Sequence, residues 1–285
     1  MKAAIRTALK VGFVATALAV VAYQVDLGGI GRRLAAADAR WLAAGLLLFN
    51  ASQAVSAARL ARVLREYGVT LPYRHHLGLY YTGMAGNLFL PGGIGGDAYK
   101  VMWLRRQEGG RAAAYVGGLL LDRGSGLAAL LCLAAATAVW WSGQPLWLAA
   151  LVPVLAGYAV VVGMFFRRYA GAGGAALLLG LAVQGLQGGA ALAVMQGLDV
   201  AAAGALSLFL LLFYLSAVAA LVPVTVGGAG ARELVFLYGL QWAGADPEPG
   251  VALALTFLAL TVVSALPGLV LLPVYGAGGG RQGPS

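Results

Sequence analysis

The sequence predicts an all-α polytopic membrane protein, an inverted-repeat helical bundle with two re-entrant hairpins broken by proline and glycine. It has either six full spans plus these two hairpins, or eight spans. Three observations lead to this fold class. First, 61% of the residues are hydrophobic and 10% are charged, whereas soluble domains carry about 25% charged residues. Second, the apolar residues form runs long enough to cross or enter a bilayer. Third, two of these runs end at similar breaks, which begin at Pro91 and Pro223.

The first half of the chain contains three predicted spanning helices, at residues 11–25, 41–58 and 112–141. The first of them follows Lys2, Arg6 and Lys10, and no small-residue cleavage site follows it. It therefore resembles an uncleaved signal anchor, which places the N-terminus in the cytoplasm. The joint 59–76 is rich in arginine and is predicted to be cytoplasmic, whereas the joint 26–40 is placed outside although it also contains arginines.

Asn50 and Gln53 stand one helical turn apart inside the second span. Side chains at positions i and i+3 share a helix face, so both amides are expected to face the bundle. They either form an interhelical hydrogen bond or contribute to a polar substrate face.

The stretch from Asn87 to Lys100 breaks the next apolar run. Residues 77–90 are too few to cross a bilayer before Pro91, and the backbone of 91–96 is expected to leave helical geometry because of proline and glycine. Such a break is tolerated at membrane depth only where protein or a water-filled cavity covers it. We expect a re-entrant segment that returns through the amphipathic leg 97–111. Its candidate site residues are Asn87, Pro91, Gly95, Gly96 and Asp97.

Asp122 and Arg123 interrupt the long run 112–141. Either the pair lies at the interface, where a span begins at Gly124, or it is an ion pair inside the bundle. Ionisable residues at depth are unfavourable and usually mark a transport pathway. Both interpretations remain open at this level.

The second half is predicted to repeat the first. It contains spans at 146–166, 175–195 and 251–274, and the run 203–222 ends in a second break. The candidate residues of this break are Pro223, Gly227, Gly228, Arg232 and Glu233. Gln184 and Gln187 stand at nearly the same offset from Asn50 and Gln53 as the second break does from the first.

Two features at one offset indicate an internal duplication within a single membrane domain, 1–285, with repeats at about 8–141 and 146–275. Three crossings and one hairpin in each half would insert the second half upside down, as in transporters whose broken helices meet near the midplane.

Three motifs follow one another in a fixed order: Asn87 and Pro91 with Gly95-Gly96-Asp97, then Asp122-Arg123, then Pro223 with Gly227-Gly228 and Arg232-Glu233. In this order they resemble the pattern of the lysylphosphatidylglycerol synthase transmembrane family. This resemblance covers about residues 10–275. It implies a flippase-like protein of the bacterial inner membrane, with a phospholipid or lipid-linked molecule as substrate. Lys100 stands where the family pattern suggests arginine, and Asp122 where glutamate is frequent. No synthase domain follows Tyr275 in this sequence, so lipid aminoacylation is not implied.

The expected function is movement of an anionic lipid or lipid-linked head group between leaflets. Arg123, Arg232 and Lys100 would add positive charge, while three acids would hold these cations or carry a coupling proton: Asp97, Asp122 and Glu233. Each charge also has a structural alternative, an ion pair or an interfacial anchor, which is favoured for Lys100.

Other function classes have weaker support. The net charge of +9 comes from Lys and Arg in short joints, so nucleic-acid binding is not expected. A single cysteine, Cys132, excludes a disulfide framework within the chain, and no metal or cofactor is expected. An intramembrane lipid-modifying enzyme lacks a recognisable catalytic constellation, so we expect no enzyme, although this class and a non-transporting scaffold subunit remain alternatives.

Overall fold

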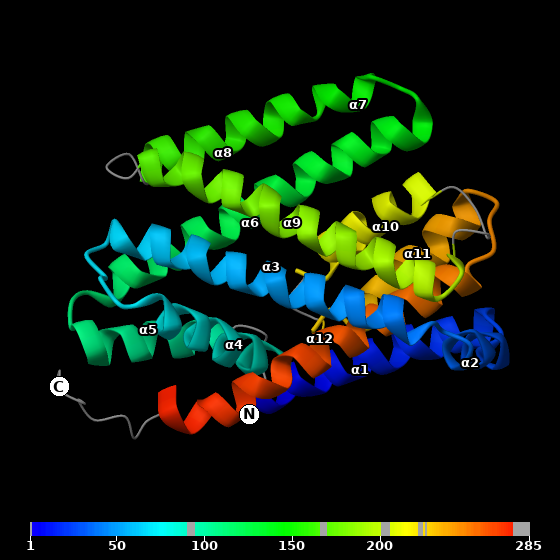
Figure 1. The fold of residues 1–285 in the computed structure, drawn as a ribbon, viewed down its shortest axis with the longest axis horizontal. Helices are drawn as coiled ribbons and strands as arrows, with labels where there is room; N and C mark the ends of the chain where they lie inside the picture. The colour runs from blue at the N-terminus through cyan, green and yellow to red at the C-terminus, as the bar shows by residue number, and fades with distance from the viewer. Residues whose placement is uncertain are drawn as a thin grey trace.

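The computed structural model describes residues 2–89, 95–165, 170–200, 206–221, 225 and 227–275. Their regular structure is entirely helical (Figure 1). The helices are α1 (Lys2–Gln24), α2 (Leu27–Ala35), α3 (Ala39–Arg65), α4 (Tyr73–Phe89), α5 (Gly95–Glu108), α6 (Ala112–Ser142), α7 (Leu146–Ala149), α8 (Leu151–Phe165), α9 (Ala170–Gly197), α10 (Leu206–Ala219), α11 (Ala231–Trp242) and α12 (Glu248–Tyr275).

The helices confirm a multi-pass membrane protein. Five helical stretches are long and apolar enough to cross a bilayer: Ala39–Arg65, Ala112–Ser142, Leu146–Met164, Ala172–Gly197 and Glu248–Leu272. A sixth candidate is the pair α1 and α2, which is bent by 91°. These six correspond to the six predicted crossings. With 17 and 14 residues, α4 and α10 fall short of the length of a span, and their re-entrant topology stays a prediction.

Helix α2 lies where the sequence predicted only a polar joint. Asp26 caps it, because its carboxylate accepts a hydrogen bond of 2.8 Å from the backbone N–H of Gly28. Both arginines of this helix have acidic partners: Arg32 lies 3.1 Å from Asp26 of the same joint, and Arg33 lies 4.0 Å from Glu248 of α12. These acids offset part of the positive charge that made the joint unusual for the side assigned to it.

Helices α3 and α9 form the centre of the bundle and run antiparallel (Figure 1). Just before α3, the backbone N–H of Asp38 donates a hydrogen bond of 2.9 Å to the carbonyl oxygen of Gly197 at the end of α9. Near the middle of both helices, the Gln187 amide donates to Ser52 Oγ at 3.4 Å. The two helices that the sequence pattern pairs as equivalents thus pack on each other in opposite directions.

Two further helix pairs pack reciprocally. Helix α4 of the first half packs against α12 of the second, and α10 of the second half packs against α6 of the first. A repeat of 8–141 and 146–275 requires such an exchange, because it makes α4 equivalent to α10 and α6 equivalent to α12. The duplication itself stays a prediction.

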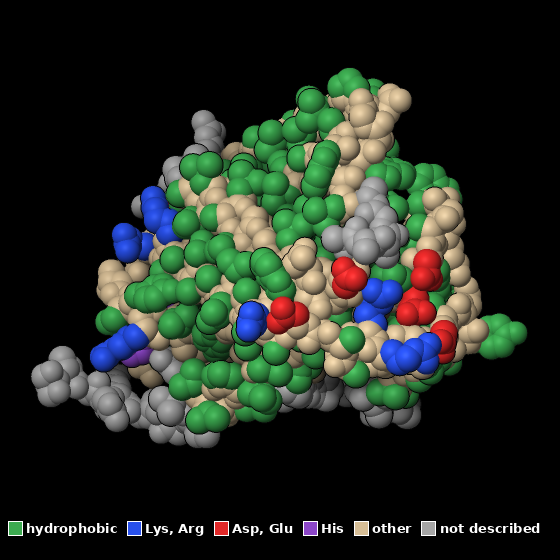
Figure 2. Space-filling view, turned by 45° about the vertical axis from the view of Figure 1, so that its right-hand side comes forward, with side chains coloured by type: hydrophobic (Ala, Val, Ile, Leu, Met, Phe, Trp, Pro, Cys, Tyr) green, Lys and Arg blue, Asp and Glu red, His purple; other side chains and the backbone are tan. Residues whose placement is uncertain are grey.

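The main core lies where α3, α10 and α12 meet. The ring of Phe257 packs edge-on against Phe213, with centroids 4.7 Å apart, and against Phe49 at 5.4 Å. All three rings are buried. Outside the core, Figure 2 shows hydrophobic side chains over most of one face, with charged side chains scattered among them and along its edges, as expected for a surface in contact with lipid.

Candidate functional site

A buried ion pair joins α3 to α6. Arg59 Nε lies 2.7 Å from Asp122 Oδ1, and Arg59 Nη2 donates to Asp122 Oδ2 at 3.3 Å. Both side chains are almost completely buried. The sequence placed Arg59 in a cytoplasmic joint and considered Asp122 together with its neighbour Arg123. Helix α3 instead continues to Arg65, which carries Arg59 into the bundle.

Asp97 lies between two cations. Its carboxylate accepts a hydrogen bond from Arg123 Nε and lies 3.5 Å from Lys100 Nζ. Lys100 is buried and also lies over the ring of Tyr80, 4.5 Å from its centroid. The Arg123 side chain is 47% exposed, against 14% for Asp97. Arg123 is therefore held by one carboxylate but remains open to a ligand.

The first break is held together by its own side chains. Gly96 N–H donates a hydrogen bond of 3.0 Å to Asn87 Oδ1, which ties the end of α4 to the start of α5. The sequence predicted that residues 91–96 leave helical geometry. This prediction was wrong for Gly95 and Gly96, which belong to α5. Here glycine serves close packing: a Cβ on Gly96 would lie 1.9 Å from the carbonyl oxygen of Gly83. Pro91 lies outside the described residues.

The second break relies on backbone conformation. Gly227, Gly228 and Gly230 have φ values of 61°, 88° and 84°, in a region that L side chains rarely adopt. Glu233 is completely buried and caps α11, since its Oε2 accepts a hydrogen bond of 2.7 Å from Gly230 N–H. Arg232 lies over the ring of Phe257, 5.5 Å from its centroid. Pro223 lies outside the described residues.

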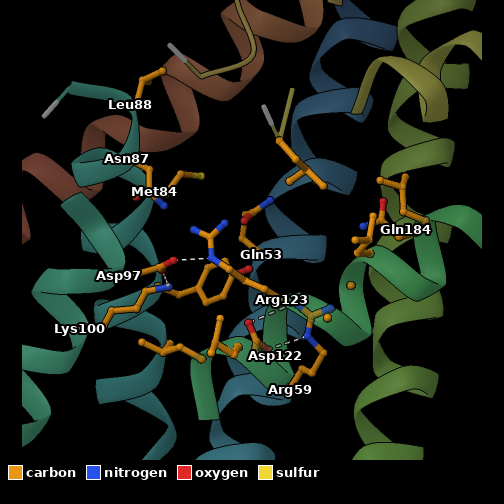
Figure 3. A pocket seen from close by; sticks show the side chains of 18 of the residues that line it. Gln53, Arg59, Met84, Asn87, Leu88, Asp97, Lys100, Asp122, Arg123 and Gln184 are labelled. Carbon is orange, nitrogen blue, oxygen red and sulfur yellow. Dashed lines mark hydrogen bonds and ion pairs between the residues drawn. The ribbon is translucent and has the colours of Figure 1, made fainter. Parts of the chain in front are cut away.

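The two ion-pair groups and Asn87 lie around a space of about 610 Å³, which we call the polar cavity (Figure 3). Its polar and charged side chains come from α3, α4, α5, α6, α9 and α12, and are Gln53, Arg59, Tyr80, Asn87, Asp97, Lys100, Asp122, Arg123, Gln184 and Thr261. Its volume falls within the usual range for a small-molecule site, about 300–1,000 Å³.

A second space of about 740 Å³ adjoins the first, and we call it the apolar cavity. Its walls are mainly aliphatic: Val101, Val116, Leu119, Leu120, Ala217, Ala220 and Leu221. The two cavities share three polar residues, Asn87, Asp97 and Arg123, and four others: Leu119, Leu120, Leu221 and Gly227 of the second break. Arg232 lines the apolar cavity only, and Glu233 lines neither. Residues from both predicted breaks therefore meet at one site.

The predicted amide pairs have mixed roles. Asn50 is hydrogen-bonded to two other helices: its amide N–H donates a bond of 2.9 Å to Ser264 Oγ, and its amide oxygen accepts a bond of 2.8 Å from the Tyr81 hydroxyl. Gln53 and Gln187 both donate to Ser52 Oγ, at 3.1 and 3.4 Å. Asn50 thus connects helices, whereas Gln53 and Gln184 line the polar cavity.

Sequence reasoning missed Arg59 and Tyr80 as part of this site. One signal for Arg59 was available: Ser52, Ser56 and Arg59 are spaced at i, i+4 and i+7, which places them on one helix face, and all three are buried. No group of three or more His, Cys, Asp or Glu side chains that could hold a metal occurs in the part of the chain that the structure describes.

The family model of the lysylphosphatidylglycerol synthase TM region matches residues 7–173. This is more than half of the chain, and it includes Asn87, Asp97 and Asp122–Arg123. The chain belongs to this family. A comparison with curated proteins finds no match. In this member of the lysylphosphatidylglycerol synthase TM region family, the second break lies outside the residues that the family model matches. Its residue Gly227 nevertheless lines the same two cavities as the matched residues Asn87, Asp97 and Arg123.

Proposed function

We propose that the protein moves a lipid with an anionic head group from one membrane leaflet to the other, without changing it chemically. The observation that carries this proposal is that the polar cavity adjoins a second cavity whose walls are mainly aliphatic but also include Arg123 and Arg232, where residues of the two predicted breaks meet. An amphiphile has the same division into a polar and an apolar part.

The charge of the polar cavity supports an anionic head group. Among its described lining residues, three cationic side chains, Arg59, Lys100 and Arg123, accompany two carboxylates, Asp97 and Asp122. This leaves one net positive charge. Arginine binds phosphate oxygens through several N–H donors at once, and Arg123 is the most exposed of the paired cations here.

The aliphatic walls of the apolar cavity support a place for acyl chains next to that head group. Because the two cavities share Arg123 and Gly227, a lipid can occupy both at once. Interrupted helices that meet near the midplane are typical of alternating-access transporters, which supports movement across the membrane over static binding.

The test is leaflet exchange by purified protein in liposomes that contain a fluorescent anionic phospholipid. Arg123→Gln removes the exposed cation, while Asp97 keeps Lys100 as its partner. We expect the exchange rate to fall by about tenfold or more, which corresponds to about 1.4 kcal/mol of lost interaction.

Arg105→Gln is the matched control, because Arg105 is exposed and lies outside both cavities. The proposal fails if Arg123→Gln exchanges lipid as fast as this control. Recovery of a covalently altered lipid would instead identify an enzyme.

A further inference from the structure

A third hollow lies beside the second break and shares no lining residue with the apolar cavity. It has a volume of about 450 Å³ and is lined by α1, the end of α4, the residue before Gly230, and α12. We call it the apolar groove, and its lining is Val11, Val14, Ala15, Leu88, Ala229, Leu258 and Val262. None of these side chains is polar. Val11 is 59% exposed, so the groove is open along α1.

Leu88 separates this groove from the polar cavity and is part of both walls. The side chain rests directly on Gly227: a Cβ added to Gly227 would lie 2.3 Å from Leu88 Cδ1. The partition is thus one flexible aliphatic side chain lying on a glycine. Gly227 adds no side chain to this partition.

We propose that the apolar groove holds one acyl chain of a two-chain lipid whose head group occupies the polar cavity. The second chain lies in the apolar cavity, so the lipid straddles the contact between Leu88 and Gly227. This inference rests on the proposed function and assigns a place to one chain of its substrate.

Three features support this occupant. The groove shares Leu88 with a cavity of net positive charge, so a ligand that spans both would combine an apolar chain with an anionic group. The polar cavity shares lining residues with two spaces that have aliphatic walls, the apolar cavity and the groove. Helix α1, which forms one wall of the groove, also packs on the second break, where a Cβ on Gly230 would lie 2.9 Å from Ala17 Cβ. The groove is therefore bounded by the transport site.

Photocrosslinking tests this placement independently of transport. The probe is a diacyl phosphatidylglycerol with a diazirine midway along one chain, reconstituted with the whole protein in phosphatidylcholine vesicles. Mass spectrometry should find labelled peptides that contain Val14 and Val262. Val262→Trp fills the groove and should lower this labelling by about tenfold. The matched control is Val263→Trp, whose native side chain is 48% exposed and does not line the groove.

Arg123→Gln provides a second measurement, because it removes head-group binding without changing the groove. Labelling of the groove should fall in this variant if the chain and head group belong to one bound lipid. Equal labelling in all three variants would mean contact with bulk lipid and would overturn the inference. If labelling follows the expected pattern but no leaflet exchange occurs, the groove assignment stands and the proposed function fails.

Discussion

At the residue scale, the site is defined by ion pairs that connect different helices. Asp122 neutralises Arg59 of α3, and Asp97 of α5 connects Lys100 with Arg123 of α6. Charged groups at membrane depth are tolerated when they are paired inside the bundle. Each carboxylate therefore determines the position of a cation at the cavity wall.

Asp122→Ala should destabilise the protein strongly. The substitution leaves the Arg59 charge buried without its carboxylate, a change that costs about 3–5 kcal/mol in proteins. We expect a lower midpoint of thermal unfolding in detergent, measured by fluorescence-detected size-exclusion chromatography. The double variant Arg59→Leu with Asp122→Ala should recover much of this loss, because no unpaired charge remains. A single variant as stable as the wild type would contradict this account.

The sequence could identify these charges but not their partners. Asp122 and Arg123 were correctly singled out as interruptions of an apolar run, yet adjacent residues on a helix point about 100° apart. Their partners lie 63 and 26 positions away, on other helices. Such pairings depend on how helices pack, which local spacing does not encode. For Lys100 the favoured prediction was an ion pair or an interfacial anchor, and of these two the structure shows an ion pair with Asp97.

At the element scale, α4 and α5 pack so closely that their contact depends on glycine. Gly83 and Gly96 face each other across this contact, and Gly268 of α12 approaches α4 in the same way, since a Cβ there would lie 2.1 Å from the carbonyl oxygen of Tyr81. Small residues at helix contacts are typical of membrane bundles, where close backbone approach replaces hydrophobic burial.

Gly96→Ala should push α4 and α5 apart. Its new methyl group would meet the backbone of Gly83, which cannot move aside as a side chain does. Overpacking commonly costs about 1–3 kcal/mol, and we expect a loss at or above this range in thermal unfolding. Gly185→Ala on α9 is the control, because nothing lies within 4 Å of its added Cβ. Equal stability of the two variants would show that the contact is less tight than described.

Helix lengths were predicted well and the shorter features less so. The long apolar runs marked α3, α6, α9 and α12 to within a few residues at most ends, because length and hydropathy are local properties. Helix α2 was missed because its sequence, Leu27-Gly-Gly-Ile-Gly31, contains three glycines, which weaken isolated helices. The structure explains why position 29 is glycine: a Cβ there would lie 2.5 Å from the Glu248 carboxylate.

At the scale of the whole molecule, the antiparallel contact of α3 with α9 is central to the predicted inverted repeat. An axis that exchanges the two halves must pass where equivalent helices cross. Gln53 of α3 and Gln187 of α9, which the repeat makes equivalent, both donate to Ser52 at this crossing. The sequence predicted the equivalence of these amides from their spacing, but it could not show that they meet.

Cysteine accessibility tests the inverted arrangement. In a Cys132→Ser background, Glu66→Cys follows α3 and Asp199→Cys follows α9. The two positions should react with a membrane-impermeant maleimide from opposite sides of oriented vesicles, and Glu66→Cys from the cytoplasmic side. Labelling of both from the same side would rule out the inverted repeat.

The unequal number of charges in the polar cavity has an electrical consequence. With three cations and two carboxylates, the empty cavity carries one net positive charge, and a singly charged anionic head group makes the occupied cavity neutral. A charge that crosses the full membrane field changes in energy by about 2.3 kcal/mol for roughly every 100 mV. In the proposed transport cycle, membrane voltage thus acts more strongly on the return of the empty polar cavity than on the step in which it is loaded.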